Sequence, residues 1–158
     1  MTTTRSDSSQ PHKIRARVYY EDTDAGGIVY HANFLRFAER ARTEFLRSLG
    51  YDHHQAREEH NIMLVVRHAE IDYKASGELD DWLEVSTEVV EMRNSSMTLK
   101  HVISRIESPK ARRRKNQAKE PDPEEPKVLV EIKVVLVAIS DIGRAVRIPP
   151  QLRQIFKG

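Results

Sequence analysis

The sequence predicts one α+β domain in which a single long helix packs on an antiparallel sheet. Residues 33–49 carry the apolar periodicity of a helix, and five other segments carry the patterns of strands. The links between the later strands are too short for parallel crossovers, so we expect antiparallel hairpins. At 158 residues the chain suits one domain with one core, and it contains no internal repeat.

The polar segment up to Pro11 predicts a disordered tail over residues 1–11, followed by one domain over residues 12–158. This segment lacks the apolar core of a secretory signal. The longest apolar run, Val134 to Ile139, is far shorter than the ~20 residues that span a bilayer. We therefore expect a cytoplasmic protein with no transmembrane segment.

The first strand is predicted over residues 13–20, where apolar and polar side chains alternate. The alternation places Tyr20 on the same face as Ile14, Ala16 and Val18, which is the inward face. A sharp turn follows over residues 21–27, because two adjacent glycines there are free to take positive φ.

The segment over residues 33–49 is the clearest helix, and Gly50 supplies its stop. Its apolar stripe is Phe34, Ala38, Ala41, Phe45 and Leu49. A stripe this broad predicts a helix laid against a large apolar surface, which in this chain is the sheet.

Four further strands are predicted over residues 63–73, 83–92, 97–106 and 128–139, with a short helix over residues 150–156. The last strand has apolar residues on both faces for much of its length. Because one helix covers only one face of a sheet, we expect a second subunit on the other face and hence a homo-oligomer.

Residues 107–127 form a charged insert with four of the seven prolines of the chain. A basic block over residues 110–119 precedes an acidic block over residues 120–125. We favour a self-neutralising loop; the alternative is a basic patch that meets phosphates of CoA, lipid or RNA. The formal net charge of +2 is too small to indicate a polyanion, so no nucleic-acid partner is expected. The absence of cysteine excludes disulfides, thiolate catalysis and Cys-ligated zinc.

Asp24 lies in the glycine turn just before the predicted helix, and it is the candidate catalytic carboxylate. The N-terminus of a helix presents unpaired N–H groups and a partial positive charge, which can hold an oxyanion. Gly26 and Gly27 let a ligand approach the backbone closely. A carboxylate that faces a polarised carbonyl can attack it or activate a water molecule against it. Thioesters suit such a site because a thiolate leaves readily.

The run from Tyr19 to Asn33, followed by residues 39–44, closely resembles the YbgC-type branch of the 4-hydroxybenzoyl-CoA thioesterase family, the Tol-Pal-associated acyl-CoA thioesterases. The resemblance implies the hotdog fold, in which an antiparallel sheet wraps around one long central helix. It implies hydrolysis of acyl-CoA or acyl-carrier-protein thioesters to free acid and thiol. It also implies dimers whose sheets join and that often form tetramers. No cofactor is implied, because CoA is part of the substrate.

The same resemblance assigns catalytic roles to three residues. The family's aspartate matches Asp24, its histidine matches His31, and an aromatic hydroxyl four residues before the aspartate matches Tyr20. The N–H groups around Tyr30 and His31 are expected to polarise the thioester carbonyl. Asp24 is then either a nucleophile that forms a mixed anhydride or a general base on water.

The substrate-binding group is expected to comprise Gly26, Gly27 and Tyr30, of which Gly27 and Tyr30 match family positions that line the substrate entrance. The chain departs from the family's pattern in its longer charged insert and in Phe34, where tyrosine is commoner. Neither departure touches Asp24 or His31.

Weaker hypotheses attach to other residues. A calcium loop at Asp22 is disfavoured, because Gly26 and Asn33 stand where oxygen ligands are required, so Asp22 is interpreted as a brace of the turn. Glu39 is a fallback carboxylate, although its arginine neighbours favour a surface ion pair. No metal site is expected, because four histidines lack ligand spacing. They are His53, His54, His60 and His68.

Two other functions stay open beside hydrolysis. One is a non-catalytic hotdog adaptor that binds acyl-carrier protein or Tol-Pal partners of the cell envelope. The other is a hotdog dehydratase, which acts on 3-hydroxyacyl thioesters and releases no thiol.

Overall fold

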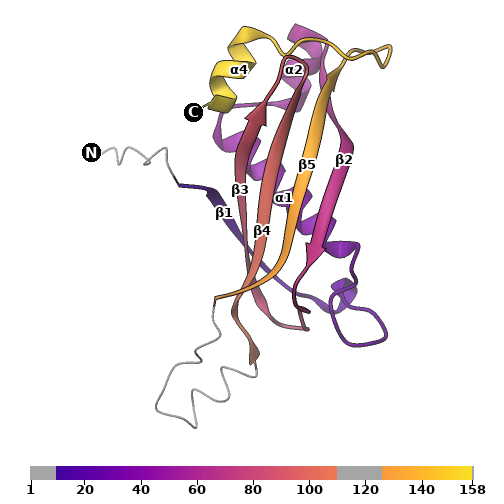
Figure 1. The fold of residues 1–158 in the computed structure, drawn as a ribbon, viewed down its shortest axis with the longest axis vertical. Coiled ribbons are helices and arrows are strands. Elements are labelled where there is room, and N and C mark those ends of the chain that lie inside the picture. Colours follow the sequence, from indigo (N-terminus) through magenta and orange to yellow (C-terminus); the bar gives the residue numbers. More distant parts are fainter. Residues whose placement is uncertain (1–9, 110–125, 158) are drawn as a thin grey trace, which may run out of the picture.

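The computed structural model describes residues 10–109 and 126–157. Its elements, labelled as in Figure 1, are β1 (His12–Arg17), η1 (Tyr20–Asp22), α1 (Asn33–Ser48), α2 (His53–His60), β2 (Met63–Tyr73), β3 (Trp82–Met92), β4 (Ser96–Glu107), β5 (Lys127–Ile139) and α4 (Pro150–Lys157). The expected tail over residues 1–11 and the expected insert over residues 107–127 lie mostly outside the described residues.

The five strands form one antiparallel sheet in the order β1-β3-β4-β5-β2. Helix α1 crosses one face of this sheet, and α2 and α4 lie together at one end of it (Figure 1). The predicted architecture of one long helix on an antiparallel sheet is therefore confirmed. The four later strands begin and end within one residue of their predicted bounds, because each carries a strong local pattern of apolar residues.

The antiparallel hairpins predicted between later strands are present for β3 and β4 and for β4 and β5, but not for β2 and β3. The link between them is short, yet β2 pairs with β5 at one edge of the sheet, while β3 pairs with β1 and β4. The link instead packs against the segment that follows β1. The Gly77 carbonyl accepts a hydrogen bond from Val29 N at 2.8 Å, and the Asp81 carbonyl accepts one from Val18 N at 3.0 Å. These contacts seat the glycine turn against the sheet.

Two local predictions also need correction. Strand β1 ends at Arg17, and Tyr20 begins the short helix η1, so Tyr20 does not continue the inward face of the strand. Helix α2 was not predicted, because it is short and polar and buries only Ala56. Its start is capped by the Asp52 side chain, which accepts a hydrogen bond from Gln55 N at 3.1 Å.

The core lies between α1 and the inner face of the sheet. Alternate residues of β4 point into it: Met97, Leu99, His101 and Ile103 are all fully buried. On the opposite face, β5 carries Glu131 and Lys133 in its first half and Val135 and Val137 in its second. The outer face of β5 is therefore apolar only in its second half. The apolar surface that a second subunit is expected to cover is limited to that half.

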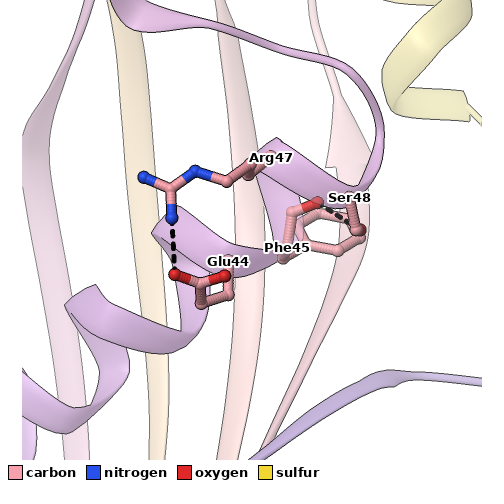
Figure 2. Close-up of polar contacts among 4 residues, drawn as sticks. All are labelled: Glu44, Phe45, Arg47 and Ser48. Carbon is pink, nitrogen blue, oxygen red and sulfur yellow. Dashed lines mark hydrogen bonds and ion pairs between the residues drawn. The ribbon is translucent and has the colours of Figure 1, made fainter.

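Helix α1 ends with local polar contacts, which Figure 2 shows. Arg47 donates a hydrogen bond to Glu44 Oε1 at 2.7 Å, and Ser48 Oγ donates one to the Phe45 carbonyl at 2.6 Å. Gly50 then takes a positive φ of 83°, which a residue with a side chain rarely adopts. Among the described ion pairs, Glu44 is the paired carboxylate on this helix. In the part of the chain that the structure describes, Glu39 forms no such pair with Arg36 or Arg40, and its charge acts instead on Arg42, where it partly offsets the lowering of the pKa by burial.

Candidate active site

The glycine turn is a tight antiparallel loop whose two arms are held by backbone hydrogen bonds. Tyr30 N donates to the Asp22 carbonyl at 2.9 Å, and Asp24 N donates to the Ile28 carbonyl at 2.9 Å. Gly27 closes the tip, since its N–H donates to the Asp24 carbonyl at 3.0 Å and its φ is +79°. Asp24 therefore sits at the tip of a rigid loop that leads directly into α1.

The Asp24 carboxylate is oriented by its own turn. Its Oδ1 accepts a hydrogen bond from Gly26 N at 2.8 Å, and Oδ2 accepts none within the described residues. A Cβ added at Gly26 would lie 3.1 Å from Asp24 Oδ1, so a side chain at this position would press on the carboxylate. The side chain of Asp24 is exposed in the single chain. One carboxylate oxygen is thus held by the turn, while the other is left without a hydrogen bond among the described residues.

Asp22 braces the loop, as predicted. It is buried, and its Oδ2 accepts a hydrogen bond from Tyr19 N at 2.9 Å. Its carbonyl also accepts a bond from Asn33 Nδ2 at 2.9 Å. This contact ties the loop to the first residue of α1, because Asn33 is itself buried at the helix start.

The entry into α1 is a turn over residues 30–33. Asn33 N donates to the Tyr30 carbonyl at 2.8 Å, and Ala32 already has helical backbone angles (φ −71°, ψ −20°). The Tyr30 N–H is occupied by the Asp22 carbonyl, so it is not free for a substrate, contrary to expectation. Within the described chain, the N–H groups of His31 and Ala32 donate no hydrogen bond. These two become the candidate donors to an oxyanion.

Aromatic side chains surround this turn. The rings of Tyr30 and His31 lie 4.5 Å apart, and the ring of Tyr73 lies 6.3 Å from His31 and 6.1 Å from Phe34. Tyr73 Oη also donates a hydrogen bond to the His31 carbonyl at 3.0 Å. Nothing in the local sequence distinguishes Tyr73, the last residue of β2, from other strand tyrosines, so its place beside the site was not predicted.

The structure brings together some of the predicted site residues and not others. Gly26 and Asp24 share a hydrogen bond, and Tyr30 and His31 share a ring contact. Tyr20 is 83% exposed, so the expectation that it points inward is wrong. Among the described residues, no hydrogen bond or ring contact joins Tyr20 or His31 to Asp24.

One further histidine, His101, is fully buried on the inner face of β4. Its Nδ1 lies 3.0 Å from Thr87 Oγ1, and its Nε2 has no partner in the described structure. Burial, with a smaller contribution from the Arg42 guanidinium, lowers the pKa of His101 to about 4. The sequence contains a signal for this burial, since His101 has the same strand parity as the apolar residues Leu99 and Ile103. His101 is part of the core and lies outside the candidate site.

Over residues 10–109 and 126–157, no cluster of three or more His, Cys, Asp or Glu side chains has an arrangement that would hold a metal ion. The same part of the chain contains no helix that is both long and apolar enough to cross a membrane.

The profile of the Thioesterase-like superfamily matches residues 18–156, which is most of the chain. The chain belongs to this superfamily. The match includes the Asp24 loop, the start of α1 and the whole of the sheet apart from β1, so it covers every residue of the candidate site.

A sequence relative carries the name of the YbgC-type branch, which residues 19–33 resemble. The acyl-CoA thioesterase YbgC of Haemophilus influenzae is 48% identical over 89 residues, which cover 56% of this chain. The aligned part is 65% of that relative, slightly less than two thirds of its length.

Two solved structures share the fold. A probable thioesterase from Bartonella henselae has a TM-score of 0.72 and 31% identity, with 89% of this chain and 100% of the other covered. A 4-hydroxybenzoyl CoA thioesterase variant in complex with 4-hydroxybenzoyl CoA has a TM-score of 0.77 at 19% identity, covering 91% and 96%. The expected hotdog fold is thereby confirmed.

Proposed function

We propose that this chain hydrolyses acyl-CoA thioesters to a free acid and CoA. One observation carries the proposal: a loop joined by hydrogen bonds to the start of α1 presents the exposed carboxylate of Asp24 and leads to two N–H groups, those of His31 and Ala32, that donate no hydrogen bond within the described residues. Membership of the Thioesterase-like superfamily and the names of the relatives support the same reaction.

In the proposed mechanism the thioester carbonyl oxygen accepts hydrogen bonds from His31 N and Ala32 N at the positive end of α1. If Asp24 is the nucleophile, its carboxylate attacks the carbonyl carbon, the C–S bond breaks, and CoA leaves as a thiolate that takes a proton from water. Water then cleaves the mixed anhydride and restores Asp24. If Asp24 is a general base, it removes a proton from the attacking water, and that proton passes to the leaving thiolate.

The functional unit is proposed to be a homo-oligomer, a dimer or a tetramer. Strand β2 is eleven residues long, forms an edge of the sheet and is exposed along most of its length. The unpaired N–H and C=O groups along a long exposed edge are a template for pairing with another chain. Tyr73 ends this strand beside His31, so a subunit paired there would close over the site and shield Asp24 from water.

The setting of the reaction is also a proposal. We propose a cytoplasmic enzyme of lipid metabolism that works beside the Tol-Pal system of the envelope and also accepts acyl-carrier-protein thioesters. The run over residues 19–33, by its resemblance to the YbgC-type branch, supports this setting. The reaction is proposed to need no cofactor or metal ion, so a chelating agent should leave the rate unchanged.

A panel of acyl-CoA substrates of graded chain length tests the function, with release of free thiol as the measurement. The Asp24→Asn variant keeps the Oδ1 contact with Gly26 N, so it should fold normally. We expect its kcat to fall by about 10³-fold or more, the scale seen when a catalytic group is removed. Equal inertness of wild type and variant over the whole panel would contradict the proposal and favour the adaptor; loss of water from a 3-hydroxyacyl thioester without thiol release would favour the dehydratase.

A further inference from the structure

We propose that Tyr73 is a positioning residue of the active site: its hydroxyl orients the peptide unit whose N–H binds the developing oxyanion. The inference rests on the proposed thioesterase function. Tyr73 ends β2 at the sheet edge, and its Oη donates to the His31 carbonyl at 3.0 Å. The two residues are far apart in the sequence, so this bond joins the edge strand to the start of α1.

The hydrogen bond from Tyr73 to the His31 carbonyl also sets the direction of an N–H group, because of the geometry of the peptide unit. In a planar trans peptide the C=O and N–H groups point in opposite directions. The His31 carbonyl and the Ala32 N–H belong to one such unit, so a donor fixed on the carbonyl aims the N–H away from Tyr73. The preceding peptide unit consists of the Tyr30 carbonyl and the His31 N–H, and it is fixed independently. Its carbonyl accepts a hydrogen bond from Asn33 N at 2.8 Å, which sets the direction of the His31 N–H.

The two candidate oxyanion donors are therefore held by different means. The N–H of His31 depends on a backbone bond inside the turn, while that of Ala32 depends on the Tyr73 side chain. A hydrogen bond to the carbonyl also polarises the peptide and strengthens its N–H as a donor. The ring of Tyr73 is itself supported by edge contacts with His31 and Phe34 at 6.3 and 6.1 Å.

Tyr73→Phe separates these contributions, because phenylalanine keeps the ring contacts and loses only the hydroxyl. Tyr19→Phe is the matched control, since Tyr19 is an exposed tyrosine of the neighbouring segment, and its hydrogen bonds among the described residues are made by its backbone N and carbonyl. Removing a direct oxyanion donor costs about 10²- to 10³-fold in kcat. We expect the loss of its orienting group to lower kcat about tenfold and to raise KM by no more than about threefold, with the unfolding midpoint unchanged.

A fall in kcat that is larger than the rise in KM would mark an interaction that is stronger in the transition state than in the bound substrate. A second readout needs no turnover: binding of a CoA ketone analogue, which keeps the carbonyl, against a CoA alkyl thioether, which lacks it. Tyr73→Phe should weaken binding of the ketone about threefold and leave the thioether unchanged, since only the ketone meets the oriented N–H.

The inference is overturned if wild type is active and Tyr73→Phe matches it within twofold. It is also overturned if the variant loses activity only together with its unfolding midpoint, or if Tyr19→Phe loses as much. A wild type that neither releases thiol nor binds either analogue would instead refute the proposed function, and the role of Tyr73 would fall with it.

Discussion

The buried histidine predicts how stability depends on pH. His101 is fully buried, and its pKa is about 4 in the folded chain against an ordinary value of 6.5. Between these two values the unfolded chain binds a proton at His101 and the folded chain does not. The stabilisation from neutral His101 is therefore complete above pH 6.5 and is lost progressively as the pH falls toward 4.

The size of the effect follows from proton linkage. With pKa values of 6.5 unfolded and about 4 folded, the free energy of unfolding should fall by about 2 kcal/mol on going from pH 7 to pH 5, and by about 3 kcal/mol at pH 4. The physical cause is first the loss of hydration of the imidazolium and second the nearby positive charge of Arg42.

Urea unfolding at pH 7, 6 and 5 measures this change, at one protein concentration because assembly alters apparent stability. His101→Gln removes the titrating group but keeps a side chain that can bond Thr87 Oγ1. The variant should lose about 2 kcal/mol less than wild type between pH 7 and pH 5. His68→Gln is the control, since the side chain of His68 is 59% exposed, and it should follow wild type. Parallel pH curves for His101→Gln and wild type would refute the reasoning.

Three further predictions concern single side chains. Gly26→Ala should lower kcat about tenfold with little change in the urea midpoint, because its Cβ would lie 3.1 Å from Asp24 Oδ1 and displace the carboxylate; an unchanged rate of thiol release would contradict this. Asn33→Ala removes the buried bond to the Asp22 carbonyl and should cost about 1 kcal/mol in urea unfolding; no loss of stability would mean that the loop is held elsewhere. Tyr51→Phe should be neutral or stabilising by up to about 1 kcal/mol, because the Tyr51 hydroxyl is buried without a partner in the described structure; a clear loss in thermal stability would point to a bond at this hydroxyl.

Local patterns account for the elements that were predicted correctly. The apolar stripe of α1 repeats at the helical period, and β2 to β5 are long runs of alternating or apolar residues, so each can be recognised without its neighbours. The same holds for the loop at Asp24, because Asp24 and the glycine pair at 26–27 are residue types that turns favour. Helix α2 was not predicted, because it buries only Ala56 and its sequence has no apolar stripe.

The side-chain direction predicted from alternation was wrong for Tyr20, because strand β1 ends before the alternating pattern does. Tyr20 continues the inward parity of β1 in the sequence, but the chain turns into η1 after Val18, and the tyrosine becomes exposed. The Tyr30 N–H gave a similar error. The N–H groups around Tyr30 and His31 were expected to bind the thioester carbonyl. In the fold, the Tyr30 N–H donates to the Asp22 carbonyl instead.

Residues close together in the chain were enough to predict α1, α4, the four later strands, the loop that carries Asp24 and the family to which the chain belongs. Local patterns did not predict that β2 lies beside β5, that Tyr73 donates a hydrogen bond to the His31 carbonyl, or that His101 is buried away from water. Each of these depends on segments far apart in sequence. Their approach is decided by how a whole sheet packs against α1, for which no local pattern of residues carries the information.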